Sequence, residues 1–196
     1  MEINEIVLEL KRHDYSHFKE FYDLTNKSIY FTALAILKEH GLAEDILQDT
    51  YVSFFANIDD VRITNNIYAY LSTIARNLSI NLINKQKNIL SNDEMISSLA
   101  DEQIRYDRDV DRILSLLDSQ EEREIVIYHI LLEYKFIEIS RIVDKPLGTI
   151  LWLYNKAIKK LKERIGEVLW KLMNWKIWLK KNVIMFKLMI IVNLFF

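Results

Sequence analysis

Residues 42–87 read LAEDILQDTYVSFFANIDDVRITNNIYAYLSTIARNLSINLINKQK, and this stretch decides the fold. Its first part places Asp45, Gln48, Asp49 and Val52 at positions i, i+3, i+4 and i+7, which form one face of an α-helix. The opposite face is mostly apolar and consists of Ala43, Leu47, Thr50, Tyr51 and Phe54. The pattern predicts a helix with one buried side and one acidic side, which either faces solvent or meets a partner.

The second part of the stretch predicts another amphipathic helix. Its apolar stripe consists of Ile67, Leu71, Ile74, Ala75, Leu78 and Leu82. Between the two helices the segment NIDDVRITNN (57–66) is short and rich in Asn and Asp, which is typical of a loop. These features together predict a helical hairpin.

The composition favours an all-α protein of one or two small domains. Of 196 residues 51% are hydrophobic, and the chain contains one Pro and three Gly. The absence of cysteine excludes disulfides and thiolate ligands, and the amino terminus has no apolar signal core, so a cytoplasmic protein is expected. His13, His17 and His40 are too dispersed for a metal site, and no phosphate-binding loop or nucleophile set is present. We therefore expect neither a cofactor nor enzymatic activity.

Charge is distributed unevenly along the chain, although the net charge is only -2. Each of the segments 1–87, 88–109 and 110–148 has more acidic than basic residues. Residues 149–196 carry ten Lys and Arg against two Glu, a net charge of +8. A basic carboxyl-terminal part predicts contact with a polyanion, either a nucleic acid or an anionic membrane.

Helical segments are also expected on both sides of the hairpin. Residues 1–40 predict one or two helices, with Gly41 as the carboxyl-terminal cap. Residues 88–109 lose the helical period and resemble an acidic linker. Beyond it, Ser119 and Glu122 have the spacing of a capping box, which predicts a helix through about residue 132.

A break at Asp144-Lys145-Pro146 then separates two helical runs in FIEISRIVDKPLGTILWLYNKAIKKLKERI (136–165). Two helices joined by so short a break predict a helix-turn-helix, which presents its second helix to the DNA major groove. An ordinary helical hairpin is the alternative.

Both halves resemble one known family. AEDILQDTYVSFF followed by IYAYLSTIARNLSINLI is similar to the pattern AEDxxQExF and WLxxIARNxxxDxxR of the core-binding and promoter-melting region of bacterial RNA polymerase sigma factors. The type is the extracytoplasmic-function (ECF) group of the sigma-70 family. Residues 136–165 resemble its promoter-binding domain, typically LSYEEIAEILGVPVGTVKSRLxRARKKLR. The two matches cover roughly residues 15–165, in the order in which the family has them.

The resemblance implies an organisation and a function. Residues 1–87 would bind core polymerase and melt the -10 element, residues 88–109 would link the domains, and residues 110–166 would bind the -35 element. The expected partners are core RNA polymerase, promoter DNA and an anti-sigma factor. The expected function is to direct polymerase to promoters, without catalysis.

The resemblance also assigns candidate site residues, which could otherwise be ordinary caps or surface residues. The polymerase-binding candidates are Asp45, Gln48, Asp49 and Val52. The candidates for the opened -10 element are Asn65, Asn66, Arg76 and Asn77. The candidates for the -35 element are Thr149, Trp152, Asn155, Lys156, Lys159 and Lys160.

Two positions depart from the family pattern. Asp144 stands where the turn commonly has Gly, and Asp tolerates the left-handed backbone better than most residues. Leu151, Trp152 and Leu153 replace a polar Lys-Ser-Arg run, which removes donors to phosphates and guanines but can provide contacts to thymine methyl groups. We therefore expect weaker or different reading of the -35 element.

Residues 167–196 form a basic, apolar tail that the family pattern does not cover. It contains Trp170, Trp175 and Trp178, and its final apolar run of 14 residues is short of the roughly 20 that span a bilayer. The tail could contact a membrane surface, cover a partner or fold back on the second domain. Two other functions therefore stay open: a stand-alone helix-turn-helix regulator and a membrane-surface adaptor that acts through this tail.

Overall fold

The computed structural model describes residues 2–62, 66–90, 110 and 114–165. All secondary structure in these ranges is helical, which confirms the predicted fold class. None of the helices in the same ranges is long and apolar enough to cross a membrane. In chain order the elements are α1 (Ile3–Lys11), α2 (Phe18–Leu37), α3 (His40–Ala56), the 3-10 turn η1 (Ile58–Asp60), α4 (Ile67–Leu90), α6 (Gln120–Val126), the π-helical turn η2 (Ile127–Leu131), α7 (Phe136–Ile142) and α8 (Leu147–Ile165).

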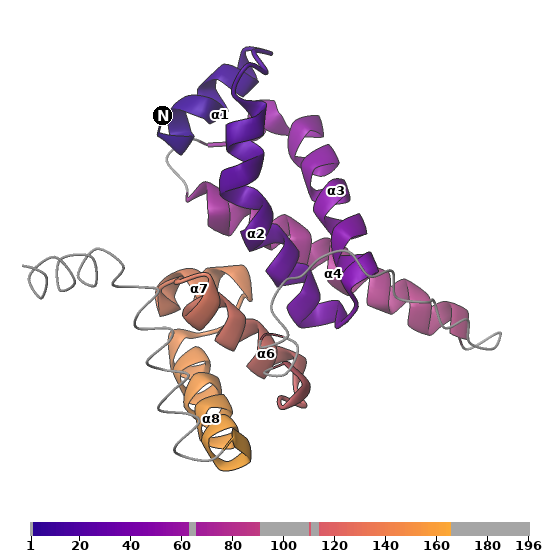
Figure 1. Ribbon diagram of the computed structural model, residues 1–196, viewed down its shortest axis with the longest axis vertical. Helices are drawn as coiled ribbons and strands as arrows, with labels where there is room; N and C mark the ends of the chain where they lie inside the picture. Colours follow the sequence, from indigo (N-terminus) through magenta and orange to yellow (C-terminus); the bar gives the residue numbers. More distant parts are fainter. Residues whose placement is uncertain (1, 63–65, 91–109, 111–113, 166–196) are drawn as a thin grey trace, which may run out of the picture.

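Helix α2 is the centre of the first group of helices. It packs against α3 and α4, and α1 covers one of its ends (Figure 1). Phe21 of α2 stacks on Phe54 of α3 with ring centroids 5.2 Å apart, and the Thr25 and Tyr51 hydroxyl groups are 2.7 Å apart in the same core. The predicted apolar faces of α3 and α4 both face this core, which confirms the hairpin faces expected from the sequence.

The connection between α2 and α3 differs from the expectation. The helix ends at Lys38, which adopts a left-handed conformation with φ 61°, and its N–H donates to the carbonyl of Leu34 at 3.0 Å. Gly41 lies inside α3, so its prediction as a cap was wrong. The left-handed residue is Lys38, three positions before Gly41. A single residue, Glu39, separates it from α3.

The second group consists of α6, η2, α7 and α8. Ser119 occupies the N-cap position of α6 but makes no side-chain cap bond, so the predicted capping box is wrong. The Glu122 carboxylate turns instead toward α8, where Lys160 Nζ donates to it at 2.8 Å. The ammonium groups of Lys156 and Lys160 are stronger partners for a buried carboxylate than one backbone N–H, so the Glu122 side chain points toward α8.

Helices α7 and α8 form the predicted helix-turn-helix. The turn contains Asp144 with φ 53°, which confirms that Asp accepts the left-handed conformation that commonly selects Gly. Ile139 and Ile142 of α7 pack with Ile150 and Leu153 of α8 in a buried cluster.

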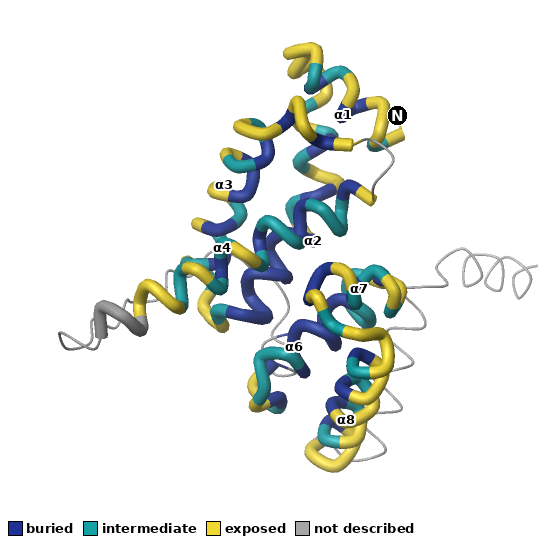
Figure 2. The backbone as a smooth tube through the Cα atoms, turned by 180° about the vertical axis from the view of Figure 1, so that it is seen from behind, coloured by how far each residue is buried: buried dark blue, intermediate teal, exposed yellow. Residues whose placement is uncertain are grey.

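The two groups of helices are packed against each other. Figures 1 and 2 show α6 beside the end of α2, and α7 lies against α4. Buried residues follow one another along both α2 and α6, where the groups meet (Figure 2). The domain boundaries at residues 87, 109 and 166 stay predictions. Helix α4 continues to Leu90. Most of the acidic linker lies outside the described residues, as does the tail with its expected membrane contact.

Candidate functional site

The outer face of α3 carries the four polymerase-binding candidates. Asp45, Gln48, Asp49 and Val52 are all exposed, and Val52 is 69% exposed. The other side of the helix is buried against α2 and α4, which sets the rotation of α3 and leaves these four side chains outward. Within the described residues neither Asp45 nor Asp49 forms an ion pair, so both carboxylates are available to a partner.

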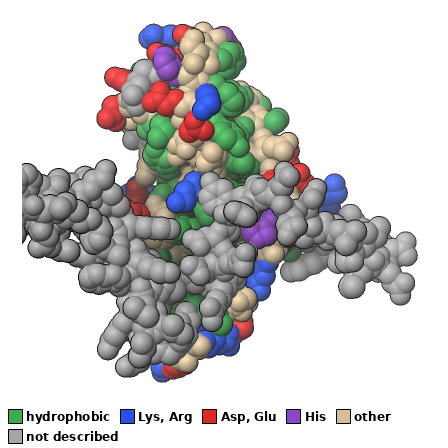
Figure 3. Space-filling view, in the orientation of Figure 1, with side chains coloured by type: hydrophobic (Ala, Val, Ile, Leu, Met, Phe, Trp, Pro, Cys, Tyr) green, Lys and Arg blue, Asp and Glu red, His purple; other side chains and the backbone are tan. Residues whose placement is uncertain are grey.

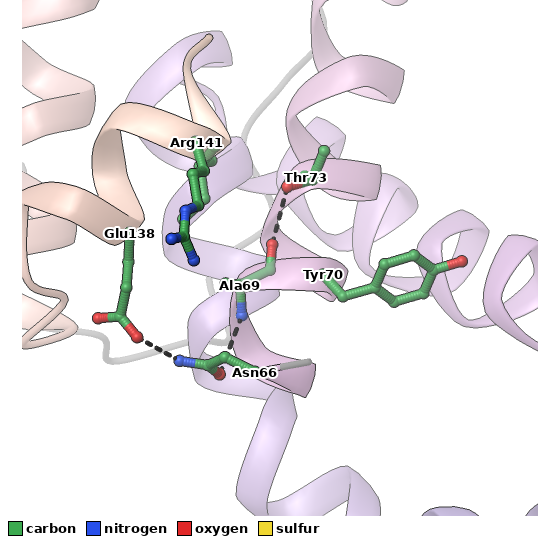
Figure 4. Close-up of a pocket in the computed structure, with 7 residues that line it drawn as sticks. Asn66, Ala69, Tyr70, Thr73, Glu138 and Arg141 are labelled. Atoms are coloured by element: carbon green, nitrogen blue, oxygen red, sulfur yellow. Dashed lines mark hydrogen bonds between the residues drawn. The ribbon is translucent and has the colours of Figure 1, made fainter. Parts of the chain in front are cut away.

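Asn66 is the first described -10 candidate, since Asn65 lies outside the described residues. Its Oδ1 accepts from the backbone N–H groups of Tyr68 at 3.1 Å and Ala69 at 3.3 Å, which caps α4. Its Nδ2 donates to Glu138 Oε1 of α7 at 2.7 Å (Figure 4). Both ends of this amide are therefore occupied.

Arg76 and Asn77 occupy different environments although they are neighbours on α4. Arg76 Nε donates to Glu124 Oε2 of α6 at 2.7 Å, and the two side chains are only 16% and 1% exposed. Asn77 is exposed. The structure therefore brings Asn66 and Arg76 onto the side of α4 that faces the second group of helices.

The -35 candidates lie on α8, and most of them are exposed. Trp152 is 60% exposed, and Lys156 Nζ lies 5.1 Å from its ring centroid, within the range of a cation–π contact. Leu147 and Leu151 are also exposed near the start of α8, so its first turns present an apolar surface. Thr149 is half-buried, and Asn155 and Lys159 are exposed.

Two of these lysines hold a buried carboxylate. Lys156 and Lys160 lie 3.1 and 2.8 Å from the oxygens of fully buried Glu122, and Lys160 also lies 3.7 Å from Asp118. Burial alone raises the pKa of Glu122, but the hydrogen bonds and charges of Lys160 and Lys156 together outweigh burial and lower it. The same contacts raise the pKa of Lys160. These two lysines therefore stabilise the α6–α8 contact, and only their remaining donors can reach DNA.

Positive and negative side chains alternate at this end of the molecule. Figure 3 shows Lys and Arg together with carboxylates near the point where α8 ends. Arg164 pairs with Asp118 at 3.1 Å, and Lys159 lies 4.0 Å from Glu163. The basic charge of the described part of α8 is partly compensated within the chain.

Sequence reasoning missed the side chains of α6, of α7 and of the turn before α7 that meet α4. Glu124 and Glu138 hold Arg76 and Asn66, and Tyr134 shares a buried hydrogen bond of 2.9 Å with Ser72. The available signal was the run Glu121-Glu122-Arg123-Glu124 immediately before the apolar residues 125–128. Three of these four charged residues are buried, and buried charges require partners.

Known proteins share both parts of this arrangement. The family described as Sigma-70 region 2 matches residues 21–89, which cover nearly all of α2, the whole of α3 and nearly all of α4. The ECF RNA polymerase sigma factor SigW of Bacillus subtilis (strain 168) is 25% identical over 192 residues, covering 86% of this chain and 99% of its own length. The ECF RNA polymerase sigma factor SigK of Mycobacterium tuberculosis (strain ATCC 25618 / H37Rv) is 21% identical, with 82% and 92% covered.

A solved structure extends the similarity to the fold. The sigma factor RpoE from Bartonella quintana, in complex with the anti-sigma factor NepR, superposes with a TM-score of 0.64 at 26% identity. The match covers 74% of this chain and 94% of RpoE. A region 2 bundle followed by a helix-turn-helix, in a chain alignable over nearly the full length of these relatives, defines a sigma factor that directs RNA polymerase to promoters.

The region 2 match, the full-length similarity to ECF sigma factors and the shared fold together support an ECF member of the sigma-70 family. Sigma factors regulate transcription without catalysis of their own. The interpretation as a stand-alone helix-turn-helix regulator leaves the matched bundle unexplained, so the comparisons favour the sigma factor.

Proposed function

We propose that this sigma factor docks on core RNA polymerase through the outer face of α3, formed by Asp45, Gln48, Asp49 and Val52. The observation that carries the proposal is the orientation of α3 within the matched bundle: these four side chains are exposed while the opposite face is buried. The carboxylates of Asp45 and Asp49, which have no ion-pair partner in the part of the chain that the structure describes, lie beside exposed Val52, so this face combines electrostatic steering with apolar contact. This role would place the protein in the cytoplasm, with the polymerase.

The test reverses the charge of this face. Asp45→Lys/Asp49→Lys is compared with Asp59→Lys/Asp60→Lys, which makes the same change at exposed positions of η1. Repulsion in place of attraction should weaken core-polymerase binding by about tenfold or more at low salt, and the difference should shrink as salt rises. Equal binding by the two variants, measured by fluorescence anisotropy with purified core enzyme, would refute this docking face.

We further propose that the residues of α4 that carry amide groups and Arg76 contact the opened -10 element. Asn66, Arg76 and Asn77 offer donors and acceptors for extruded bases and phosphates, and Asn65 belongs to the same proposed set. Asn66 and Arg76 are occupied by Glu138 and Glu124 in the present arrangement. DNA binding through them therefore requires that α6 and α7 move away from α4.

We propose that the first turns of α8 contact the -35 element. The exposed Leu147, Leu151 and Trp152 suit contact with thymine methyl groups, while Asn155 and Lys159 remain for polar contacts. Because the polar run of the family pattern is missing, phosphate contacts contribute less here, and the affinity for this element should be modest.

A second protein partner is part of the proposal. RpoE was solved in complex with the anti-sigma factor NepR, and its fold covers most of this chain. By analogy, an anti-sigma factor would bind this chain and compete with polymerase for its helices.

A further inference from the structure

The last residue of α1 is joined to the turn that precedes α4. Lys11 Nζ donates to the backbone carbonyl of Asp59 at 2.9 Å and to the backbone carbonyl of Val61 at 2.8 Å. These acceptors lie 48 and 50 positions further along the chain. One ammonium group therefore connects the first helix to the place where the chain leaves η1 toward Asn66.

The two acceptors are backbone carbonyls at the end of the η1 turn. Within this turn the N–H groups of Asp60 and Val61 donate to the carbonyls of Asn57 and Ile58 at 3.1 and 3.2 Å. The last carbonyls of a helical turn have no partner inside the turn and carry partial negative charge, so a cation suits them. Two bonds from one ammonium group to carbonyls two residues apart restrict backbone rotation between them. They therefore fix the direction in which the chain leaves Val61.

Helix α1 is anchored well enough to be the fixed side of this contact. Ile6, Val7 and Leu10 are each no more than 1% exposed and belong to the main hydrophobic cluster. Ile58 and Val61 are buried in the same cluster. Because Leu10 directly precedes Lys11, the end of α1 that carries the ammonium group is held in the core.

The other end of α1 lies near the beginning of α4. Burial and, to a smaller extent, the negative charge of Glu2 raise the pKa of Tyr68, which places Glu2 close to this side chain. Ile67 is buried in the same cluster as α1, and Asn66 caps α4. With nine residues, α1 is about 14 Å long. The helix therefore extends from the turn before Arg62 to the first turn of α4, and its length sets the separation of the two.

This separation matters for the proposed contact with an opened -10 element. A base that leaves the duplex loses its stacking and pairing, and it is retained only where the protein supplies hydrogen-bond partners. Such bonds need donor–acceptor distances of about 2.7–3.2 Å, so their geometry tolerates little drift of the backbone. Asn66, at the start of α4, is one of the proposed partners, and Val61 is buried while Arg62 is exposed directly after it.

We propose that Lys11 is a positioning residue for promoter opening, which acts through α1 to keep the backbone at Val61 at a fixed distance from Asn66. The proposal rests on the proposed -10 contacts of α4. Lys11 itself does not contact the DNA, because backbone carbonyls occupy two of its three N–H donors. The docking face on α3 does not depend on this contact.

The main test measures promoter opening by polymerase that carries the full chain. The probe is a duplex that the wild-type holoenzyme selects from a random library in run-off transcription, with 2-aminopurine placed in its -10 element. Lys11→Met should slow the rise in fluorescence by about tenfold, since one hydrogen bond to a charged group contributes about this factor. Lys11→Arg should restore most of the rate, because a guanidinium can donate to both carbonyls. Lys19→Met is the matched control, since Lys19 lies on the exposed side of α2 and pairs with Asp23, and it should open the duplex as wild type does.

Salt dependence separates positioning from direct contact with a phosphate. The measurement is anisotropy with the selected single strand and the holoenzyme over a range of salt concentrations. Loss of one phosphate contact lowers the slope of log K against log salt by about 0.7 for a single strand. Lys11→Met should weaken binding at every salt concentration and keep the wild-type slope. A slope reduced by this amount would overturn the positioning role and make Lys11 a DNA contact.

A spin label reports the η1 turn directly and needs no DNA. Because the sequence has no cysteine, Asp60→Cys, an exposed position of η1, accepts a single nitroxide. Its electron paramagnetic resonance spectrum should show more motion when Lys11→Met is added. The same spectrum in both backgrounds would overturn the claim that Lys11 holds the turn.

Asn77→Ala distinguishes failure of this inference from failure of the proposed -10 contacts, because Asn77 is an exposed candidate on α4. If Asn77→Ala slows opening while Lys11→Met opens at the wild-type rate, the positioning role is overturned and the contacts of α4 stand. If neither variant slows opening, both proposals are overturned. Core-polymerase binding should be the same for all variants. A Lys11→Met chain that fails to bind core enzyme, while Lys11→Arg binds it, would overturn a role confined to promoter opening.

Discussion

Replacing Arg76 by Met should destabilise the protein far more than the loss of a surface ion pair. The change leaves the Glu124 carboxylate, which is 1% exposed, without its guanidinium partner. Removing one partner of a buried pair typically costs about 3–5 kcal/mol. Here Arg76 retains 16% exposure and Gln120 still donates to Glu124, so we expect about 2–3 kcal/mol of lost unfolding free energy.

The assay is urea unfolding followed by far-UV circular dichroism. Lys19→Met is the control, because it removes an exposed i,i+4 pair with Asp23 and should cost less than about 0.5 kcal/mol. The double variant Arg76→Met/Glu124→Met should recover most of the stability lost in the single variant, because no buried charge remains. An Arg76→Met variant as stable as the control would refute the reasoning, since it would mean that Glu124 is solvated and the two groups of helices do not pack in solution.

Two further predictions concern the carboxylate on which Lys156 and Lys160 converge and the reading surface of α8. The pKa of Glu122 is lowered from 4.5, so its contribution to stability is fully present above about pH 4.5 and is lost as pH falls through the lower folded value. Urea midpoints should therefore drop on acidification more in wild type than in Glu122→Gln, and equal slopes would contradict the role of the lysines. If Leu147, Leu151 and Trp152 meet thymine methyl groups, replacing one contacted thymine of the -35 element by deoxyuridine should cost about 0.8 kcal/mol, or about fourfold in affinity. Anisotropy with the polymerase complex should show this loss in wild type but not in Trp152→Ala, and a wild type indifferent to the methyl group would rule out apolar reading.

Local sequence patterns were sufficient to predict the helices and which face of each helix is buried. The i, i+3, i+4 spacing placed Asp45 and Asp49 outward and Phe54 inward on α3, and the structure confirms these orientations. The break around Asp144 was recognisable because turn chemistry depends on adjacent residues. The Ser119–Glu122 box was wrong because Lys156 and Lys160 of α8 hold the Glu122 carboxylate, and the Gly41 cap was wrong because Lys38 already adopts the left-handed conformation three positions earlier.

The sequence alone determined the all-helical class, the rotation of each amphipathic helix and the resemblance to the sigma-70 family, because helical periodicity and short motifs depend on residues within a few turns of one another. Only the tertiary structure decided which polar side chains are already engaged. Arg76 and Glu124 lie 48 positions apart in the chain, and Asn66 and Glu138 lie 72 apart. No local pattern contains such pairs, because they form only when the second group of helices packs against α4, and this packing excludes water from the Arg76–Glu124 ion pair.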